Sequence, residues 1–144
     1  MKHLILMVIL AAALVPVAVT AAPACDPTLT VSPSPSVAGE TVNLSGVCYE
    51  ATYHGKTTGY FVYVFDSVGN QTFVSLYDMP INPDETLDYD IVTGPAYEGS
   101  DIIRGFPSPD TYRLEVYRAQ RQCHQGFCTD QKYDLLFVTN HTVV

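Results

Sequence analysis

The chain has 144 residues, a formal net charge of −8 at pH 7, ten Tyr and no Trp. This length suits one domain around a single hydrophobic core and leaves no room for a second domain. The acidic balance argues against nucleic acid as a partner, because negative charge on the protein repels the phosphate backbone.

The first 24 residues have the pattern of a signal peptide. Lys2 precedes an apolar run over residues 4–14, and small residues lead to a cleavage site before Cys25. We expect residues 1–24 to be removed and residues 25–144 to form the mature domain. Because Lys2 is the one charged residue removed, the mature chain would carry a charge of −9. This predicts a secreted or cell-surface protein.

The N-terminal segment has two alternative interpretations, a lipoprotein signal and an uncleaved membrane anchor. A lipoprotein would be acylated on Cys25. An uncleaved anchor is disfavoured, since the apolar run is short for a bilayer and contains Pro16. No later segment is apolar enough to span a membrane, so we expect no membrane-spanning part in the mature chain.

Alternation of apolar and polar residues predicts seven strands and no helix. The expected elements are strands over residues 28–32 and 41–47, a hairpin over 59–76 with its turn at 67–70, and strands over 86–92, 111–117 and 132–139. In the last strand we expect Tyr133, Leu135 and Phe137 to point inward. Seven short strands separated by turn residues are typical of an antiparallel β-sandwich.

The hairpin over residues 59–76 is the centre of the predicted fold. Phe61, Tyr63 and Phe65 fall on one side of its first strand, and Val62 and Val64 fall on the other. A continuous apolar run of this kind predicts a strand buried on both sides. Such a strand lies in the middle of a sheet.

A long connection over residues 93–110 lacks any regular pattern. It carries Ile102, Ile103 and Phe106, which we expect to pack onto the rim of the core. Long connections of this kind are common places for function.

Two segments resemble microbial immunoglobulin-like domains. AGETVNLSG, residues 38–46, is similar to their second strand, and SPDTYRLEVYR, residues 108–118, is similar to their sixth. Tyr112 takes the place of their corner tyrosine. The resemblance implies an immunoglobulin-like sandwich, but this fold hosts unrelated functions.

Four cysteines in an exported chain predict two disulfides. If Leu29 faces Leu44 in the first strand pair, the same register places Cys25 opposite Cys48. This register favours a local disulfide at this end of the chain.

The second disulfide is predicted in the same way. If Leu114 faces Phe137, Cys123 lies opposite Cys128 across a four-residue turn. The competing pairing joins Cys48 to Cys123 between the two sheets, as in antibody-type domains. Local pairing is the preferred prediction.

Two metal sites are weighed and disfavoured. A zinc site would use two cysteines and two histidines, but an oxidising compartment favours disulfides over thiolates. A calcium site would use acidic residues that otherwise form a solvated edge. The zinc candidates are Cys123, Cys128, His54 and His124, and the calcium candidates are Asp84, Glu85, Asp88 and Asp90. We expect no metal and no other cofactor.

Catalysis is disfavoured for lack of a nucleophile motif. His54 and His124 are interpreted as loop residues and His141 as a tail residue. Catalysis by a pair of carboxylates, as in glycosidases, stays an open alternative at this point. The prediction is therefore a protein that is not an enzyme.

Three N-glycosylation sequons occur, at Asn43, Asn70 and Asn140. We expect Asn70 to be exposed at the hairpin tip and Asn140 to be exposed in the tail. Asn43 is expected to point outward from its strand.

Thr57, Thr58, Gly59 and Tyr60 form a predicted binding loop that enters the central strand. This run resembles part of the chagasin-type cysteine-protease inhibitors, which plug a papain-like cleft with three loops. Lys56 departs from that family, which has proline before the threonines. The resemblance implies an inhibitor of papain-type proteases.

These observations predict a secreted, disulfide-stabilised, non-catalytic immunoglobulin-like module with a binding or structural role. Its expected partner is a protein or carbohydrate at or outside the cell surface. The alternative is the chagasin-like inhibitor, and an enzyme ranks third.

Overall fold

A computed structural model describes residues 25–53, 56–75 and 78–144. The predicted signal peptide, His54 and Leu76 lie outside these residues. The strands are β1 (Thr30–Ser32), β2 (Val42–Gly46), β3 (Thr52–Tyr53), β4 (Lys56–Phe65), β5 (Gln71–Val74), β6 (Leu87–Ile91), β7 (Gly94–Pro95), β8 (Ile103–Arg104), β9 (Asp110–His124) and β10 (Phe127–Val143). In this part of the chain, no helix is long and apolar enough to cross a membrane.

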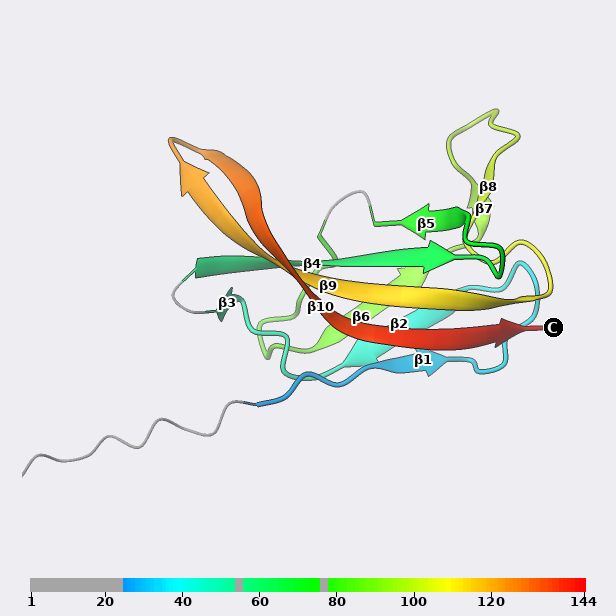
Figure 1. Cartoon of the computed structure of the whole chain (residues 1–144), viewed down its shortest axis with the longest axis horizontal. Coiled ribbons are helices and arrows are strands. Elements are labelled where there is room, and N and C mark those ends of the chain that lie inside the picture. The colour runs from blue at the N-terminus through cyan, green and yellow to red at the C-terminus, as the bar shows by residue number, and fades with distance from the viewer. Residues whose placement is uncertain (1–24, 54–55, 76–77) are drawn as a thin grey trace, which may run out of the picture.

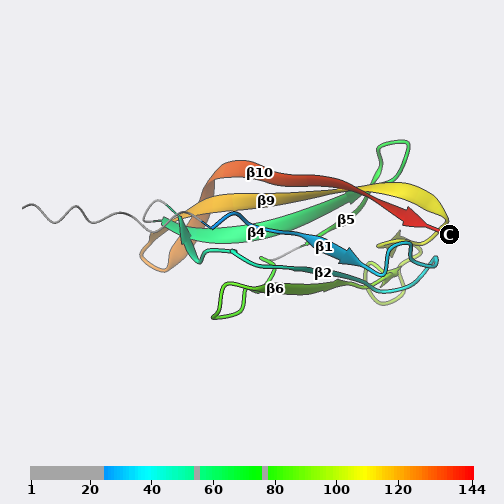
Figure 2. The same ribbon diagram turned by 90° about the horizontal axis from the view of Figure 1, so that it is seen from below.

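The strands form two main layers, which Figure 2 shows one above the other. One layer is a three-stranded sheet of order β1-β2-β6, and the other is a five-stranded sheet of order β10-β9-β4-β3 in which β5 also pairs with β4. Neighbouring strands within each sheet are antiparallel. A separate hairpin of β7 and β8 projects at one end (Figure 1). The predicted antiparallel β-sandwich is confirmed.

The hydrophobic core lies between the two sheets. Alternate side chains of each strand point inward, as the period of two requires. On the five-stranded sheet, Val62 pairs with Val116 and Val64 pairs with Leu114. The three-stranded sheet contributes Val42, Leu44, Leu87 and Ile91, all buried.

Strand β4 is central in its sheet, as predicted, but it is buried on one side only. Val62 and Val64 are fully buried, whereas Phe61, Tyr63 and Phe65 stay partly exposed. The three-stranded sheet packs on the inner side of β4, and the outer side faces solvent. The prediction of burial on both sides is therefore wrong.

The register of the first strand pair differs from the prediction by two residues. Val31, rather than Leu29, lies opposite Leu44. A shift of two keeps the same side chains on the same face, so the inward pattern survives. Cys25 and Cys48 are bonded nonetheless, because both lie beyond the paired residues.

The pairing of β9 with β10 changes along its length. Near the tip Cys123 lies opposite Cys128 as predicted, but Leu114 lies opposite Thr139 rather than Phe137. Two irregularities cause this difference, and each inserts one extra residue into β10. The turn contains two residues, Gln125 and Gly126, both at positive φ, rather than four.

The irregularities in β10 also change which side chains face the core. Tyr133 and Leu135, predicted to point inward, are 52% and 50% exposed. Leu136 and Phe137 pack against the core instead. An extra residue reverses the alternation of the residues around it, which periodicity alone does not show.

The long connection is partly as predicted. Phe106 is fully buried, and its ring meets Tyr112 edge to face at 5.0 Å. Ile102, by contrast, is 65% exposed, and Ile103 is also exposed. These two belong to the projecting β7–β8 hairpin and do not pack onto the core rim.

His141 is a core residue of β10, not the tail residue that was predicted. It is 1% exposed and packs edge to face on Phe106 at 5.2 Å. Its Nε2 lies 2.7 Å from Ser36 Oγ, in a buried hydrogen bond. Burial lowers the pKa of the imidazole, because the charged form is poorly solvated there.

This burial predicts a stability loss on mild acidification. The pKa of His141 is lower in the folded than in the unfolded protein. The contribution of its neutral imidazole to the free energy of unfolding is therefore present above about pH 6.5 and is lost as pH falls. Urea unfolding at pH 7.5 and 5.5 measures the change. His141→Gln should flatten the slope by up to about 1.4 kcal/mol per pH unit. His124→Gln, which replaces an exposed histidine, is the matched control. Equal slopes in both variants would contradict the assignment.

Candidate functional site

The outer side of the five-stranded sheet carries a cluster of aromatic side chains. They come from three adjacent strands, because β9 lies between β4 and β10. In β4 and β9, Phe61 lies opposite Tyr117, Tyr63 opposite Glu115, and Phe65 opposite Arg113. We call the outward rings the aromatic face: Phe61, Tyr63, Phe65, Tyr117 and Tyr133.

The rings of the aromatic face contact one another. Tyr63 and Tyr117 meet edge to face, with ring centroids 5.5 Å apart. Tyr63 and Phe65 are nearly parallel at 6.4 Å, and Phe61 lies 6.2 Å from Tyr133. Such contacts hold each ring in place, so the face is ordered without a ligand.

A shallow groove of about 310 Å³ crosses the aromatic face. Its volume lies at the lower end of the range for small-molecule sites. The lining residues are Tyr63, Phe65, Gln71, Glu115, Tyr117 and Tyr133. Aromatic rings therefore form most of the wall, with a few polar groups between them.

Glu115, which lines the groove, is the centre of a polar network. Arg113 Nε lies 2.9 Å from Glu115 Oε1, and Tyr117 Oη donates to Glu115 Oε2 at 2.7 Å. The hydrogen bond to the carboxylate raises the pKa of Tyr117. The Arg113 guanidinium also lies over the Phe65 ring, 4.8 Å from its centroid, in a cation–π contact. The network offers both donors and acceptors to a ligand at the rings.

The outer side of the other sheet is different in character. Asn43 on β2 donates from Nδ2 to Asp88 at 2.6 Å and to Asp90 at 2.9 Å. The sequon asparagine therefore points outward as predicted, with its amide already bonded. Acidic groups therefore lie on the outer side of the three-stranded sheet, and aromatic rings lie on the outer side of the five-stranded sheet.

The other sequon positions are exposed. Asn70 lies at the tip of the β4–β5 hairpin and donates to Asp66 Oδ2 at 2.9 Å. Asn140 lies in β10, not in a tail.

The predicted binding loop is part of strand β4. Thr57, Thr58, Gly59 and Tyr60 all lie within Lys56–Phe65, and the last three are buried. Tyr60 Oη donates to the carbonyl of Glu50 at 2.8 Å. These residues hold the sandwich together and do not present a loop, so their placement in a loop is wrong.

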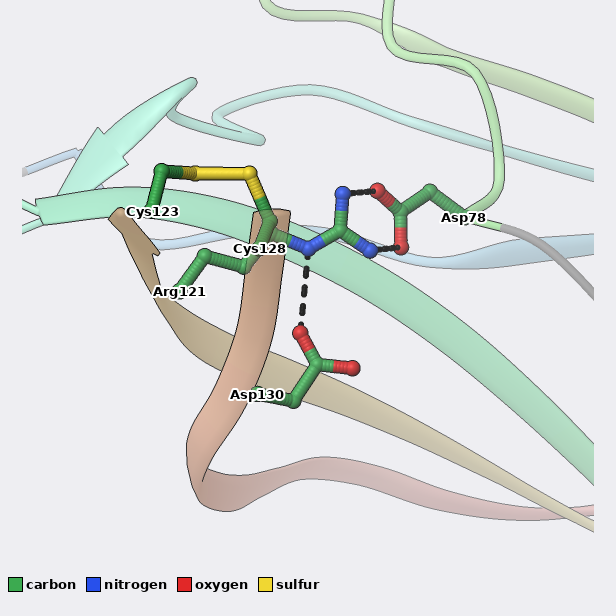
Figure 3. Close-up of a disulfide and its surroundings, with 5 residues drawn as sticks. All are labelled: Asp78, Arg121, Cys123, Cys128 and Asp130. Carbon is green, nitrogen blue, oxygen red and sulfur yellow. Dashed lines mark hydrogen bonds and ion pairs between the residues drawn. A yellow bond between two sulfur atoms is a disulfide. The ribbon is translucent and has the colours of Figure 1, made fainter. Parts of the chain in front are cut away.

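Gly59 leaves room for an ion-pair network near the β9–β10 hairpin. Arg121 pairs with Asp78 and donates from Nε to Asp130 at 3.0 Å. Figure 3 shows Arg121 between the two carboxylates, beside the disulfide of the hairpin. A Cβ on Gly59 would lie 2.5 Å from Asp78 Oδ1. The network therefore requires glycine at this position.

Both predicted disulfides are confirmed. Cys25 is bonded to Cys48, and Cys123 to Cys128. The sulfur of Cys25 is thus occupied in this structure and is not open to acylation. Two disulfides are consistent with an extracytoplasmic or otherwise oxidising environment.

The metal candidates do not converge. Among the described residues, no group of three or more His, Cys, Asp or Glu side chains is placed to hold a metal ion. Cys123 and Cys128 are bonded to each other, and Asp84 accepts a hydrogen bond from Thr86 Oγ1 at 2.7 Å. His54 of the zinc alternative lies outside the described residues.

The aromatic face was missed by sequence reasoning. Phe61, Tyr63 and Phe65 were assigned to the interior, and Tyr133 was too. The useful signal was in β9, where Arg113, Glu115 and Tyr117 alternate with buried residues. Because β9 pairs with β4, its polar side marks the outer side of β4 as well.

No protein-family model matches the chain, and no curated protein matches it. Inference about function therefore depends on the chemistry of the site.

The role of Gly59 can be tested by adding one methyl group. Gly59→Ala should lower the free energy of unfolding by about 1–3 kcal/mol, because Asp78 is held by Arg121 and cannot move freely. Gly94→Ala is the matched control, since no atom lies within 4 Å of its added Cβ. In a protein that also carries Asp78→Ala, Gly59→Ala should cause a smaller loss of free energy of unfolding. An unchanged cost there would show that the close approach to Asp78 is not the cause.

Proposed function

We propose that the protein is a non-catalytic binding module of an extracytoplasmic compartment, and that the aromatic face is its binding surface. One observation carries this proposal. Five rings from three adjacent strands gather on one outer side of a sheet and remain partly exposed. Apolar groups clustered on a surface in this way are typical of interaction sites.

The surroundings of the aromatic face support binding over a purely structural role. Leu135 and Val138 of β10 are exposed near it, which extends the apolar surface. Tyr is enriched at interfaces because a rigid ring and a hydroxyl combine in one side chain. The rings sit on paired strands, so little ordering entropy is lost when a ligand binds.

The polar groups near the core do not support catalysis. Ser36 and His141 are hydrogen-bonded as a nucleophile and base would be, but both are buried. A substrate would have to displace the core to reach them. In the groove, Glu115 already bonds Arg113 and Tyr117, which leaves it poorly suited to act as a base.

The protease-inhibitor alternative stays a prediction with less support. Its motif depends on an exposed loop, whereas Thr58, Gly59 and Tyr60 are buried in β4. We therefore expect no inhibition of papain-like proteases by the mature protein, which a titration of active enzyme would measure. Submicromolar inhibition would contradict this expectation and restore the alternative.

The binding surface can be located by NMR. Amide spectra of labelled protein are recorded with neutral oligosaccharides and, separately, with pools of random dodecapeptides. We expect at least one probe to cause saturable shifts concentrated in β4, β9 and β10. Shifts confined to β1, β2 and β6 would contradict the assigned surface, and so would the absence of any saturable shift.

A further inference from the structure

We infer that the ligand of the aromatic face is an uncharged carbohydrate chain that lies along the groove between Tyr133 and Gln71. This inference rests on the proposed binding function and names the class of ligand. Charge, surface chemistry and groove shape each support it.

The charges of the groove are balanced within the protein. Glu115 is the one acidic side chain that lines the groove, and Arg113 neutralises it at 2.9 Å. At the other end, the Tyr133 hydroxyl donates to Asp130, a carboxylate outside the groove lining that shares Arg121 with Asp78. The one ion pair of the first groove is therefore balanced, and an uncharged ligand suits that groove. This neutrality stands out in a chain with a net charge of −8.

The chemistry of the lining matches a sugar ring. A pyranose has flat faces made of C–H groups and a rim of hydroxyls. The ring faces of Tyr63 and Tyr133 can stack on the C–H faces, as aromatic groups do with other apolar surfaces. Of the lining residues, Glu115 can accept from sugar hydroxyls, and Gln71 can both accept and donate. Protein interfaces are also rich in aromatic residues and Arg, so peptide binding is measured beside carbohydrate binding.

The shape of the surface favours a chain over a single sugar. The groove on the aromatic face and a second groove of about 250 Å³ share Gln71 as a lining residue. The second groove runs between β5 and the β7–β8 hairpin and includes Ile103 and Arg104. Their lining residues extend from β10 across β9, β4 and β5 to the β7–β8 hairpin. A path with two successive segments fits linked sugar units.

The test is retention of the disulfide-bonded mature protein by defined polysaccharides. Native electrophoresis is run in gels that contain barley β-glucan, xyloglucan, arabinoxylan, galactomannan or starch, and cellulose and chitin powders are used for pull-down. We expect at least one of these neutral polymers to retain the protein. For soluble fragments of that polymer, calorimetry should give a Kd that changes less than about twofold between 50 and 500 mM NaCl, because neutral ligands are not screened.

Three variants locate the site. Tyr133→Ala and Tyr63→Ala should each weaken binding about tenfold or more, since each removes a stacking surface. Tyr133 is half exposed, so its removal should leave folding intact. Tyr97→Ala is the matched control, because Tyr97 is 69% exposed but lies outside the groove. It should change the Kd less than about twofold.

Each other result counts against the inference. If no neutral oligosaccharide shifts the aromatic face and no neutral polymer retains the protein, the carbohydrate inference fails, and the binding function stands if dodecapeptides still bind there. Retention by polygalacturonate or heparin alone would show a charged ligand. Saturable shifts with dodecapeptides alone would indicate a protein ligand. Retention that survives both Tyr63→Ala and Tyr133→Ala would place the site elsewhere.

Discussion

Strand β4 connects the stability of this protein to its proposed function, because successive side chains of one strand point to opposite sides of the sheet. Val62 and Val64 point inward and are fully buried. The neighbouring aromatic residues point outward and build the aromatic face. Any change in the register of β4 by one residue would exchange these two sets. The register of β4 with β9 is therefore the constraint on which the rest depends.

Two devices hold the strands together near the hairpin end of the sheet, one between β4 and β9 and one between β9 and β10. Arg121 of β9 pairs with Asp78, whose carboxylate lies against Gly59 of β4. The disulfide between Cys123 and Cys128 closes the hairpin two residues beyond Arg121. Both devices act at one end of β4 and β9 and leave the aromatic face open. A rigid sheet with open rings is suited to binding without rearrangement.

Much of the fold could be predicted from the sequence, because period-two alternation is a strong signal wherever one side of a strand is buried. The strand predicted over residues 111–117 lies within β9, and its alternate residues Tyr112, Leu114 and Val116 are buried. Both disulfides were also predicted, although the assumed register was two residues off in the first strand pair and, away from the tip, in the second. In the first pair this error leaves the faces unchanged, whereas the extra residues in β10 place Tyr133 and Leu135 on the outer side.

The candidate site was harder to predict because an aromatic run in a strand has two meanings. The run from Phe61 to Phe65 fits a strand buried on both sides and equally fits one with an aromatic outer side. Tyr133 was misplaced because the extra residues in β10 interrupt the alternation. His141 was misplaced because the last strand extends to Val143, beyond its apolar pattern. Bulges and strand ends depend on tertiary pairing, which single-sequence patterns do not contain.

Hydroxyl-radical footprinting of the free mature protein tests most directly whether the aromatic face is open. The reaction reports exposure of each tyrosine ring regardless of its ionisation. Tyr133 should be modified readily, as Tyr97 should be, while the buried Tyr49, Tyr60 and Tyr112 should be protected. If Tyr133 proved as protected as the buried tyrosines while Tyr97 reacted, the outer side of the sheet would be covered in the free protein. That result would contradict the aromatic face as a binding surface.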